Sequence, residues 1–322
     1  MANDNSTGRP DRRGVRPEIR AMLERDDLLP PSTPEELTPT GRRASSSVRL
    51  PGLWGPLEPV TRVDEIAVPV GGGASVRARI YRPENALGTI FFLHGGGWAI
   101  GSLDTHEGPT RRLANATPAN VVSLEYRKAP ENPFPIPVAD CNAGLDWLIA
   151  NGVGLGLDTA RIVIAGESAG ANLAAVVARH ARDRGIALAG QVLIYPVADT
   201  AMDTQSYGDY AAGFFLAADG MRWFIEQYFA DPEHAAHPDA ALVRTPIADL
   251  AGLAPAHILT AEFDPLRDEG RAYAQRLIAA GNDVTYREWK GVIHGFWIMN
   301  AVTPTAGEVI ADVGAWIRGR WG

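Results

Sequence analysis

The sequence predicts an α/β protein with a mostly parallel central sheet, flanked by helices on both faces and carrying a helical cap. Short, nearly continuous apolar runs recur between residues 89 and 289, and such runs are typical of strands buried on both faces. Segments with helical periodicity separate them, and this alternation implies right-handed crossovers in a doubly wound architecture. The connection between Pro196 and Pro255 is too long for a simple loop and indicates a lid or binding element.

The length and composition predict a globular protein outside the membrane. A chain of 322 residues suffices for one core with an elaboration. It is 46% hydrophobic and 21% charged, and no apolar stretch approaches the roughly 18 residues of a membrane span. Residues 1–14 are polar and lack the apolar segment of a secretory signal. We therefore expect a cytoplasmic protein without a membrane span.

Charge and cysteine content exclude several partners and cofactors. The formal net charge is −8 and the pI is near 5.4, so no basic field attracts polyanions and nucleic acid is not expected as a partner. Cys141 is the single cysteine, which rules out an intramolecular disulfide and paired-cysteine metal or redox motifs. We expect this residue in the core, and we predict no metal and no cofactor. The sequence leaves a homodimer open.

The first 50 residues are rich in Pro, Ser, Thr and Arg and predict a tail with one short docked helix. Its apolar residues recur at roughly helical spacing within residues 17–29. A strand-like segment at residues 66–70, three glycines at 71–73 and an alternating segment at 76–81 follow. This pattern predicts a hairpin at the edge of the sheet.

The rest of the chain alternates between predicted strands and predicted helices. The strands are expected at residues 89–93, 121–124, 161–165, 191–195, 257–259 and 283–289. The helices are expected at residues 138–150, 169–184, 267–280 and 308–318. Within the long insertion, a further helix carries an apolar stripe that we expect to pack onto the main body, formed by Met221, Phe224, Ile225 and Tyr228.

The stretch GESAG at residues 166–170 matches the pattern G-x-S-x-G and lies between a predicted strand and a predicted helix. In that context the pattern indicates a nucleophile elbow, a strained turn that exposes the serine hydroxyl. Glycine at both ends, Gly166 and Gly170, lets neighbouring backbone pass close by. Ser168 is therefore the predicted nucleophile.

The stretch HGGGW at residues 94–98 follows the predicted strand at 89–93. A glycine-rich loop there can direct backbone N–H groups to one point, where acyl transfer develops a negatively charged oxygen. The predicted donors of this oxyanion hole are Gly96, Gly97 and Ala169. A phosphate-binding loop is the weaker interpretation, because no Lys-Ser/Thr follows and no G-x-G-x-x-G helix start is present.

A serine nucleophile needs a base to take its proton and a carboxylate to hold that base. After a nucleophile elbow, the acid and then the histidine follow along the chain, each on a loop beyond a strand. His294 alone follows the last predicted strand, so it is the predicted base. The other histidines beyond the elbow are expected to be structural or exposed, namely His180, His234, His237 and His257.

The predicted acid is Asp264, which stands just past the strand that contains residues 257–259. Glu262 comes too early, at the end of that strand. Asp268 and Glu269 are expected to begin the following helix, where acidic residues favour the N-terminus without any catalytic role. Asp268 is kept as the reserve candidate.

Taken together, these motifs resemble the hormone-sensitive-lipase family of bacterial carboxylesterases, of the α/β-hydrolase superfamily. The resemblance rests on HGGGW, GESAG, YRKAPENPFP at residues 126–135, DPLRD at 264–268 and HGF at 294–296, and it begins at about residue 60. It implies the α/β-hydrolase fold, a triad of Ser168, Asp264 and His294, and no cofactor. It also implies short to medium acyl esters as substrates and a cap made from the N-terminal helices and the insertion. In that family His94 mainly shapes the oxyanion loop.

The expected organisation has three parts: an N-terminal tail and cap helices at residues 1–55, a catalytic domain at 56–196 and 250–322, and a cap insertion at 197–249. Aromatic residues near the site are candidates for contacting substrate, namely Phe214, Phe215, Trp98, Trp223 and Phe224.

Two residues beside the nucleophile depart from the family pattern. Glu167 replaces the common aspartate, and Ala171 stands where a second glycine is frequent. We expect Glu167 to pair with an arginine and fix the elbow, and tuning of substrate or pH preference is the alternative.

The predicted reaction is hydrolysis of a small carboxylic ester through an acyl-enzyme. An amidase, a lactonase or a deacetylase with the same triad is the nearest alternative. A non-enzymatic ligand-binding protein that keeps the fold is the alternative from another class.

Overall fold

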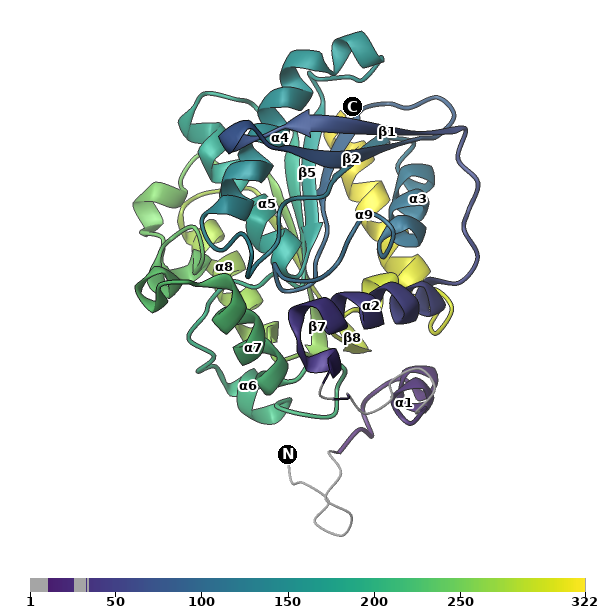
Figure 1. The fold of residues 1–322 in the computed structure, drawn as a ribbon, viewed down its shortest axis with the longest axis vertical. Coiled ribbons are helices and arrows are strands. Elements are labelled where there is room, and N and C mark those ends of the chain that lie inside the picture. Colours follow the sequence, from purple (N-terminus) through teal and green to yellow (C-terminus); the bar gives the residue numbers. More distant parts are fainter. Residues whose placement is uncertain (1–10, 26–32, 34, 322) are drawn as a thin grey trace.

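A computed structural model describes residues 11–25, 33 and 35–321, and it contains an eight-stranded sheet (Figure 1). The strand order is β1-β2-β4-β3-β5-β6-β7-β8; β2 runs antiparallel to β1 and β4, and the other pairs are parallel. The strands are β1 (Arg62–Pro69), β2 (Ser75–Arg82), β3 (Thr89–Leu93), β4 (Asn120–Leu124), β5 (Ile162–Glu167), β6 (Gly190–Ile194), β7 (Ala256–Phe263) and β8 (Val284–Ile293).

Helices cover both faces of this sheet, which confirms the predicted α/β fold class (Figure 1). One face packs against α4 (Ile136–Asn151), α5 (Ala169–Asp183) and α8 (Arg267–Ala279). The other face packs against α3 (Glu107–Ala116) and α9 (Thr305–Trp321). β3 and β5, at the centre, are buried at every position, as strands covered on both faces must be.

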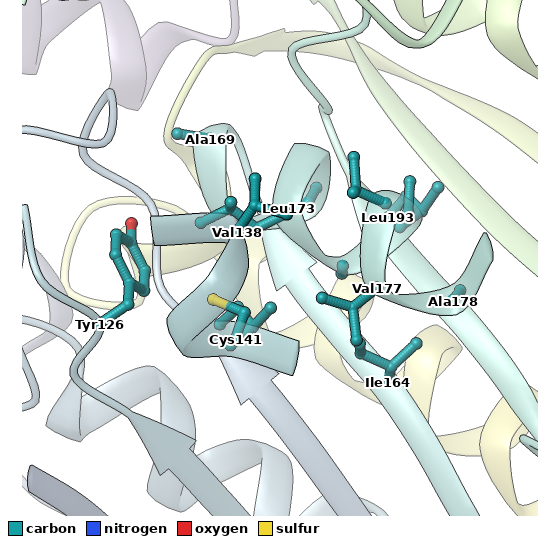
Figure 2. Packing of buried hydrophobic residues seen from close by; sticks show 14 of the residues in the cluster. Tyr126, Val138, Cys141, Ile164, Ala169, Leu173, Val177, Ala178 and Leu193 are labelled. Atoms are coloured by element: carbon teal, nitrogen blue, oxygen red, sulfur yellow. The ribbon is translucent and has the colours of Figure 1, made fainter. Parts of the chain in front are cut away.

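The core between α4, α5 and the sheet is built from small and branched side chains (Figure 2). Val177 of α5 lies next to Ile164 of β5 in this cluster, Leu173 of α5 lies near Val138 of α4, and Cys141 of α4 belongs to the same cluster. Cys141 is fully buried and free, which confirms its predicted place in the core. Because α5 is buried along most of its length, the turn that precedes it is held on a rigid support.

The predicted edge hairpin is confirmed, since β1 pairs with β2 across the turn at Gly71–Gly73. The six other predicted strands and the four predicted helices of the main body all occur, with most bounds shifted by a few residues. The first helix, α1 (Pro17–Leu23), ends earlier than predicted, and residues 26–29 lie outside the described ranges.

The residue patterns gave no individual prediction for three helices, α2 (Pro39–Trp54), α3 and α6 (Gln205–Asp209), although the resemblance implied cap helices within residues 1–55. The α2 segment was read as tail because serine, arginine, glycine and an internal Pro51 give it a weak helical pattern. Its start did carry a signal: Thr38 caps the helix by accepting a hydrogen bond from Gly41 N, and Pro39 occupies the first turn.

The insertion at residues 197–249 forms α6 (Gln205–Asp209), α7 (Ala218–Tyr228) and three 3₁₀ turns, at Pro232–Ala236, Leu242–Arg244 and Ile247–Leu250, the last ending just beyond it. The predicted apolar stripe faces inward, with Met221, Phe224 and Tyr228 buried and Ile225 partly so. Within the described ranges, no helix is both long enough and apolar enough to cross a membrane.

Candidate active site

Ser168 sits in a sharp turn between β5 and α5. Its backbone has φ 56° and ψ −124°, a left-handed conformation that is strained for a residue with a side chain. A Cβ on Gly166 would lie 2.3 Å from the carbonyl oxygen of Gly170, and a Cβ on Gly170 would lie 2.1 Å from that of Leu93. Only glycine fits at both positions, so the two glycines of the motif permit the turn.

The turn brings Ser168 to His294, and His294 to Asp264. Nε2 of His294 lies 3.1 Å from Oγ of Ser168, and Nδ1 of His294 lies 2.8 Å from Oδ2 of Asp264. Ser168 and His294 are each 7% exposed, and Asp264 is fully buried. The imidazole therefore bridges the hydroxyl and the carboxylate at hydrogen-bond distance, an arrangement that allows general-base activation of the serine.

The acid and the base stand on loops beyond neighbouring strands. Asp264 follows β7, and its Oδ1 accepts a hydrogen bond from the backbone N–H of Leu266, which orients the carboxylate. His294 follows β8. The reserve candidate Asp268 lies in the first turn of α8, where it pairs with Arg267 and accepts a hydrogen bond from Ser206 N.

The other histidines beyond the elbow have partners of their own. His180 pairs with Asp239, and His257 with Asp312. His234 and His237 pack against Phe134.

Two of the predicted oxyanion donors, Gly96 and Gly97, line the same cavity as Ser168, and the third, Ala169, is the first residue of α5. Gly96 has φ 112° and Gly97 has φ 55°. In the part of the chain that the structure describes, none of these three N–H groups has a hydrogen-bond acceptor. Donors left without acceptors beside a nucleophile are suited to a developing oxyanion.

His94 stabilises this loop from beneath. Burial lowers the pKa of His94 well below its ordinary value, so the ring is neutral and its Nδ1–H donates to the carbonyl of Gly95 at 2.8 Å. The ring stacks on Tyr126 with centroids 4.5 Å apart, and the Tyr126 hydroxyl donates to the His94 carbonyl.

Glu167 pairs with a histidine, not with the predicted arginine. Its Oε1 lies 2.8 Å from Nε2 of His106 and accepts the N–H of Gly95 at 2.6 Å. Burial opposes ionisation, but the hydrogen bond from His106 and the field of His294 hold the pKa of Glu167 below its usual value. His106, which precedes the elbow in the chain, was missed because nothing local distinguishes it. A Cβ on Gly95 would lie 2.1 Å from Glu167 Oε1, so this contact requires glycine.

A cavity of about 400 Å³ opens above Ser168 and His294. Of the three residues predicted to contact substrate, Phe215 lines it and Phe214 and Trp98 do not. Phe214 packs edge-on against Tyr210 within the insertion. Trp98 is fully buried and stacks flat on Tyr228, 4.2 Å between centroids, because the apolar stripe of α7 docks there. Of the two further aromatic candidates, Phe224 lines the cavity and Trp223 does not.

Helix α2 provides one wall of this cavity, in line with the cap of N-terminal helices and insertion that the resemblance implies, but the sequence predicted none of its lining side chains. Residues spaced three and four apart place one face of the helix on the cavity: Arg42, Ser45, Ser46, Arg49, Leu50 and Leu53. The insertion supplies the facing wall through Leu216, Ala217, Gly220 and Met221. Among the described residues, no three His, Cys, Asp or Glu side chains gather in a way that could hold a metal ion.

Known proteins are similar to this chain in sequence and in fold. A family model described as the α/β hydrolase fold matches residues 90–298. Carboxylesterase NlhH of Mycobacterium tuberculosis is 37% identical over 301 residues, which cover 91% of this chain and 93% of the relative. An ethyl acetate hydrolase of Pseudomonas putida is 34% identical over 258 residues, covering 78% of this chain and 80% of the relative.

Solved structures agree with these relatives. A thermostable esterase from Pseudomonas putida superposes with a TM-score of 0.91 at 33% identity, covering 96% of this chain and 98% of that one. A hyperthermophilic esterase from Pyrobaculum calidifontis gives a TM-score of 0.89 at 37% identity, covering 95% and 98%. The chain belongs to the α/β-hydrolase fold family. Within it, the predicted resemblance to the hormone-sensitive-lipase family of bacterial carboxylesterases is confirmed.

Proposed function

We propose that Ser168, His294 and Asp264 act as the catalytic triad of this chain, which is a carboxylic ester hydrolase. The observation that carries the triad is the 3.1 Å contact between Ser168 Oγ and His294 Nε2, with Asp264 at 2.8 Å behind the ring. Similarity to an ethyl acetate hydrolase and to carboxylesterase NlhH supports the ester as substrate.

Acylation begins when His294 Nε2 takes the proton of the Ser168 hydroxyl and Oγ forms a bond to the ester carbonyl carbon. The carbonyl π electrons move to oxygen, and Asp264 stabilises the imidazolium. As the carbonyl re-forms, the bond to the alcohol oxygen breaks and His294 gives its proton to the departing alcohol. Water then attacks the acyl-enzyme by the same route, releasing the carboxylic acid and restoring the Ser168 hydroxyl.

The N–H groups of Gly96, Gly97 and Ala169 are the proposed oxyanion donors. Each preorganised donor contributes roughly 3 to 4 kcal/mol of barrier lowering in comparable sites. None of these donors has an acceptor among the described residues, so they reorganise little when charge develops.

Short to medium acyl chains are the proposed substrates. A cavity of about 400 Å³ lies in the lower part of the usual range for small-molecule sites and is walled by both α2 and the insertion. Phe215, Phe224 and Ile298 give it apolar surface for an acyl chain.

The test is hydrolysis of para-nitrophenyl esters from acetate to palmitate, with Ser168→Ala as control. We expect activity that peaks on short chains and is lost in the variant. Activity that survives the substitution would mean that Ser168 is not the nucleophile. A cytoplasmic location stays a prediction of the sequence, which also allows a homodimer.

A further inference from the structure

The cavity that opens on Ser168 carries positive charge at its α2 wall. Among the described residues that line it, Arg42 and Arg49 are the arginines and Glu167 is the one carboxylate. Glu167 lies at the site floor, where His106 and Gly95 already engage it. Arg42 therefore places positive charge on the α2 wall, although the whole chain has a net charge of −8.

Among the described residues, Arg42 has no acidic partner. Its guanidinium lies over the ring of Trp223, 4.3 Å from the centroid, and its Nε is buried without a hydrogen-bond acceptor in the described part of the chain. Burial lowers the pKa of Arg42, but the ordinary value is so high that the group stays charged at neutral pH. A cation partly removed from water and left without an anion is costly, so its presence calls for an explanation.

The need to hold α2 in place does not explain the partly buried charge of Arg42, because the neighbouring Arg43 already anchors the helix. Arg43 donates to the backbone carbonyls of Ala99 and Ala129 and forms two hydrogen bonds with Glu131. Adjacent residues on a helix point in directions about 100° apart. Arg43 is therefore turned to the main body, whereas Arg42 is turned to the cavity.

Arg42 stands at one end of the α2 face that lines the cavity, and Leu53 stands at the other end. From Arg42 to Leu53 the lining face spans 11 residue steps, roughly 16 Å along the helix axis. Ser45 and Ser46 lie between the two arginines on the same face and add hydroxyl donors.

We infer that this wall selects esters that carry a second, ionised carboxylate at the far end of the acyl chain, and that Arg42 binds that carboxylate. Monoesters of linear dicarboxylic acids are the substrate class. A guanidinium presents paired N–H donors that match the two oxygens of a carboxylate. Trp223 holds the flat face of the guanidinium and leaves its edge for the ligand. This inference rests on the proposed ester hydrolysis.

The experiment compares kcat/KM for monoethyl adipate with that for ethyl hexanoate, a neutral ester with the same acyl length, by titrating the acid released at pH 7.5. Arg42→Gln removes the charge, and Arg42→Lys keeps it without the paired donors. Arg222→Gln is the matched control, because Arg222 lies beside Trp223 on α7 but pairs with Asp219 outside the cavity.

We expect Arg42→Gln to lower kcat/KM for the monoanion about ten- to a hundredfold more than for the neutral ester. Arg42→Lys should give a loss between those of wild type and Arg42→Gln. Arg222→Gln should leave the ratio of the kcat/KM values for the two esters unchanged. If Arg42→Gln does not fold, the wild-type protein alone tests the inference. Its ratio of kcat/KM for the monoanion to kcat/KM for the neutral ester should fall when added salt screens the charges.

An equal loss for both esters in Arg42→Gln would overturn the inference, because it would show that Arg42 only ties α2 to Trp223. A wild-type ratio that is insensitive to salt would overturn it too. If the wild-type protein hydrolyses neither ester, the proposed hydrolysis itself fails, whereas hydrolysis of ethyl hexanoate without a charge effect rejects only the role of Arg42.

Discussion

Glu167, the residue before Ser168, accepts a hydrogen bond from His106 at 2.8 Å and another from the N–H of Gly95 at 2.6 Å. One buried carboxylate thus ties the nucleophile elbow to the loop that carries Gly96 and Gly97. Both elements must keep their relative positions for the oxyanion donors to face the carbonyl that Ser168 attacks.

Replacing Glu167 by Gln should lower kcat on para-nitrophenyl butyrate about ten- to a hundredfold with a smaller change in KM. The substitution removes the charge that His106 faces and puts an NH₂ group at one carboxylate oxygen. We expect His106→Gln to have a similar effect, and the double variant to lose much less than the sum of the two. Fully additive losses would show that the two residues act separately.

Replacing Asp264 by Asn should lower kcat about 10³- to 10⁴-fold, as expected when the partner of a catalytic imidazole can no longer stabilise its positive charge. The amide oxygen can still accept the Leu266 N–H, so the fold should persist with an unchanged circular dichroism spectrum. Asp268→Asn is the control, and it should retain activity within a few-fold. If Asp268→Asn lost much more activity than Asp264→Asn, Asp268 would be the acid of the triad.

Adding a methyl group at Gly97 should damage the oxyanion loop. A Cβ there would lie 2.2 Å from the ring of Phe224, and the backbone has φ 55°, which L side chains rarely adopt. We expect Gly97→Ala to lower kcat/KM about a hundredfold. The double variant Gly97→Ala/Phe224→Ala should recover part of this loss, since it removes the clash but not the backbone strain. No recovery would assign the whole effect to the backbone.

Glu269 should make the protein less stable as pH rises. Burial, aided by the charges of Asp199 and Asp264, raises the pKa of Glu269 well above its ordinary 4.5, while two backbone N–H groups donate to its Oε1. The unfolded chain releases this proton at lower pH than the folded chain. The native state therefore loses up to about 1.4 kcal/mol of stability per pH unit between the unfolded and folded pKa values.

The variant Glu269→Gln removes this titration. The melting temperature of the variant should therefore rise relative to that of the wild type as pH increases from 5 to 8. Asp268→Asn is the contrasting control. Burial opposes ionisation of Asp268, but Arg267 lowers its pKa, so its stabilising effect is present at neutral pH and lost on acidification. A constant gap between Glu269→Gln and wild type across this range would contradict the raised pKa.

The central sheet and the three residues of the proposed triad were predictable because their signals are local. Buried strands have continuous apolar runs, and the Ser168 turn needs Gly166 and Gly170 within two residues of it. Chain order along an α/β sheet then left Asp264 and His294 as the residues beyond the last strands, and the structure places His294 against Ser168 and Asp264 against His294.

Only the tertiary structure determined the walls of the cavity and the contacts that support the residues of the site. The partner of Glu167 lies 61 residues away, and no spacing rule connects the two positions. Helix α2 has weak intrinsic propensity, and it is its packing against the body and the Arg43 anchors that place Arg42 on the cavity wall. Contacts between distant segments depend on how whole elements pack, and local sequence patterns do not record that packing.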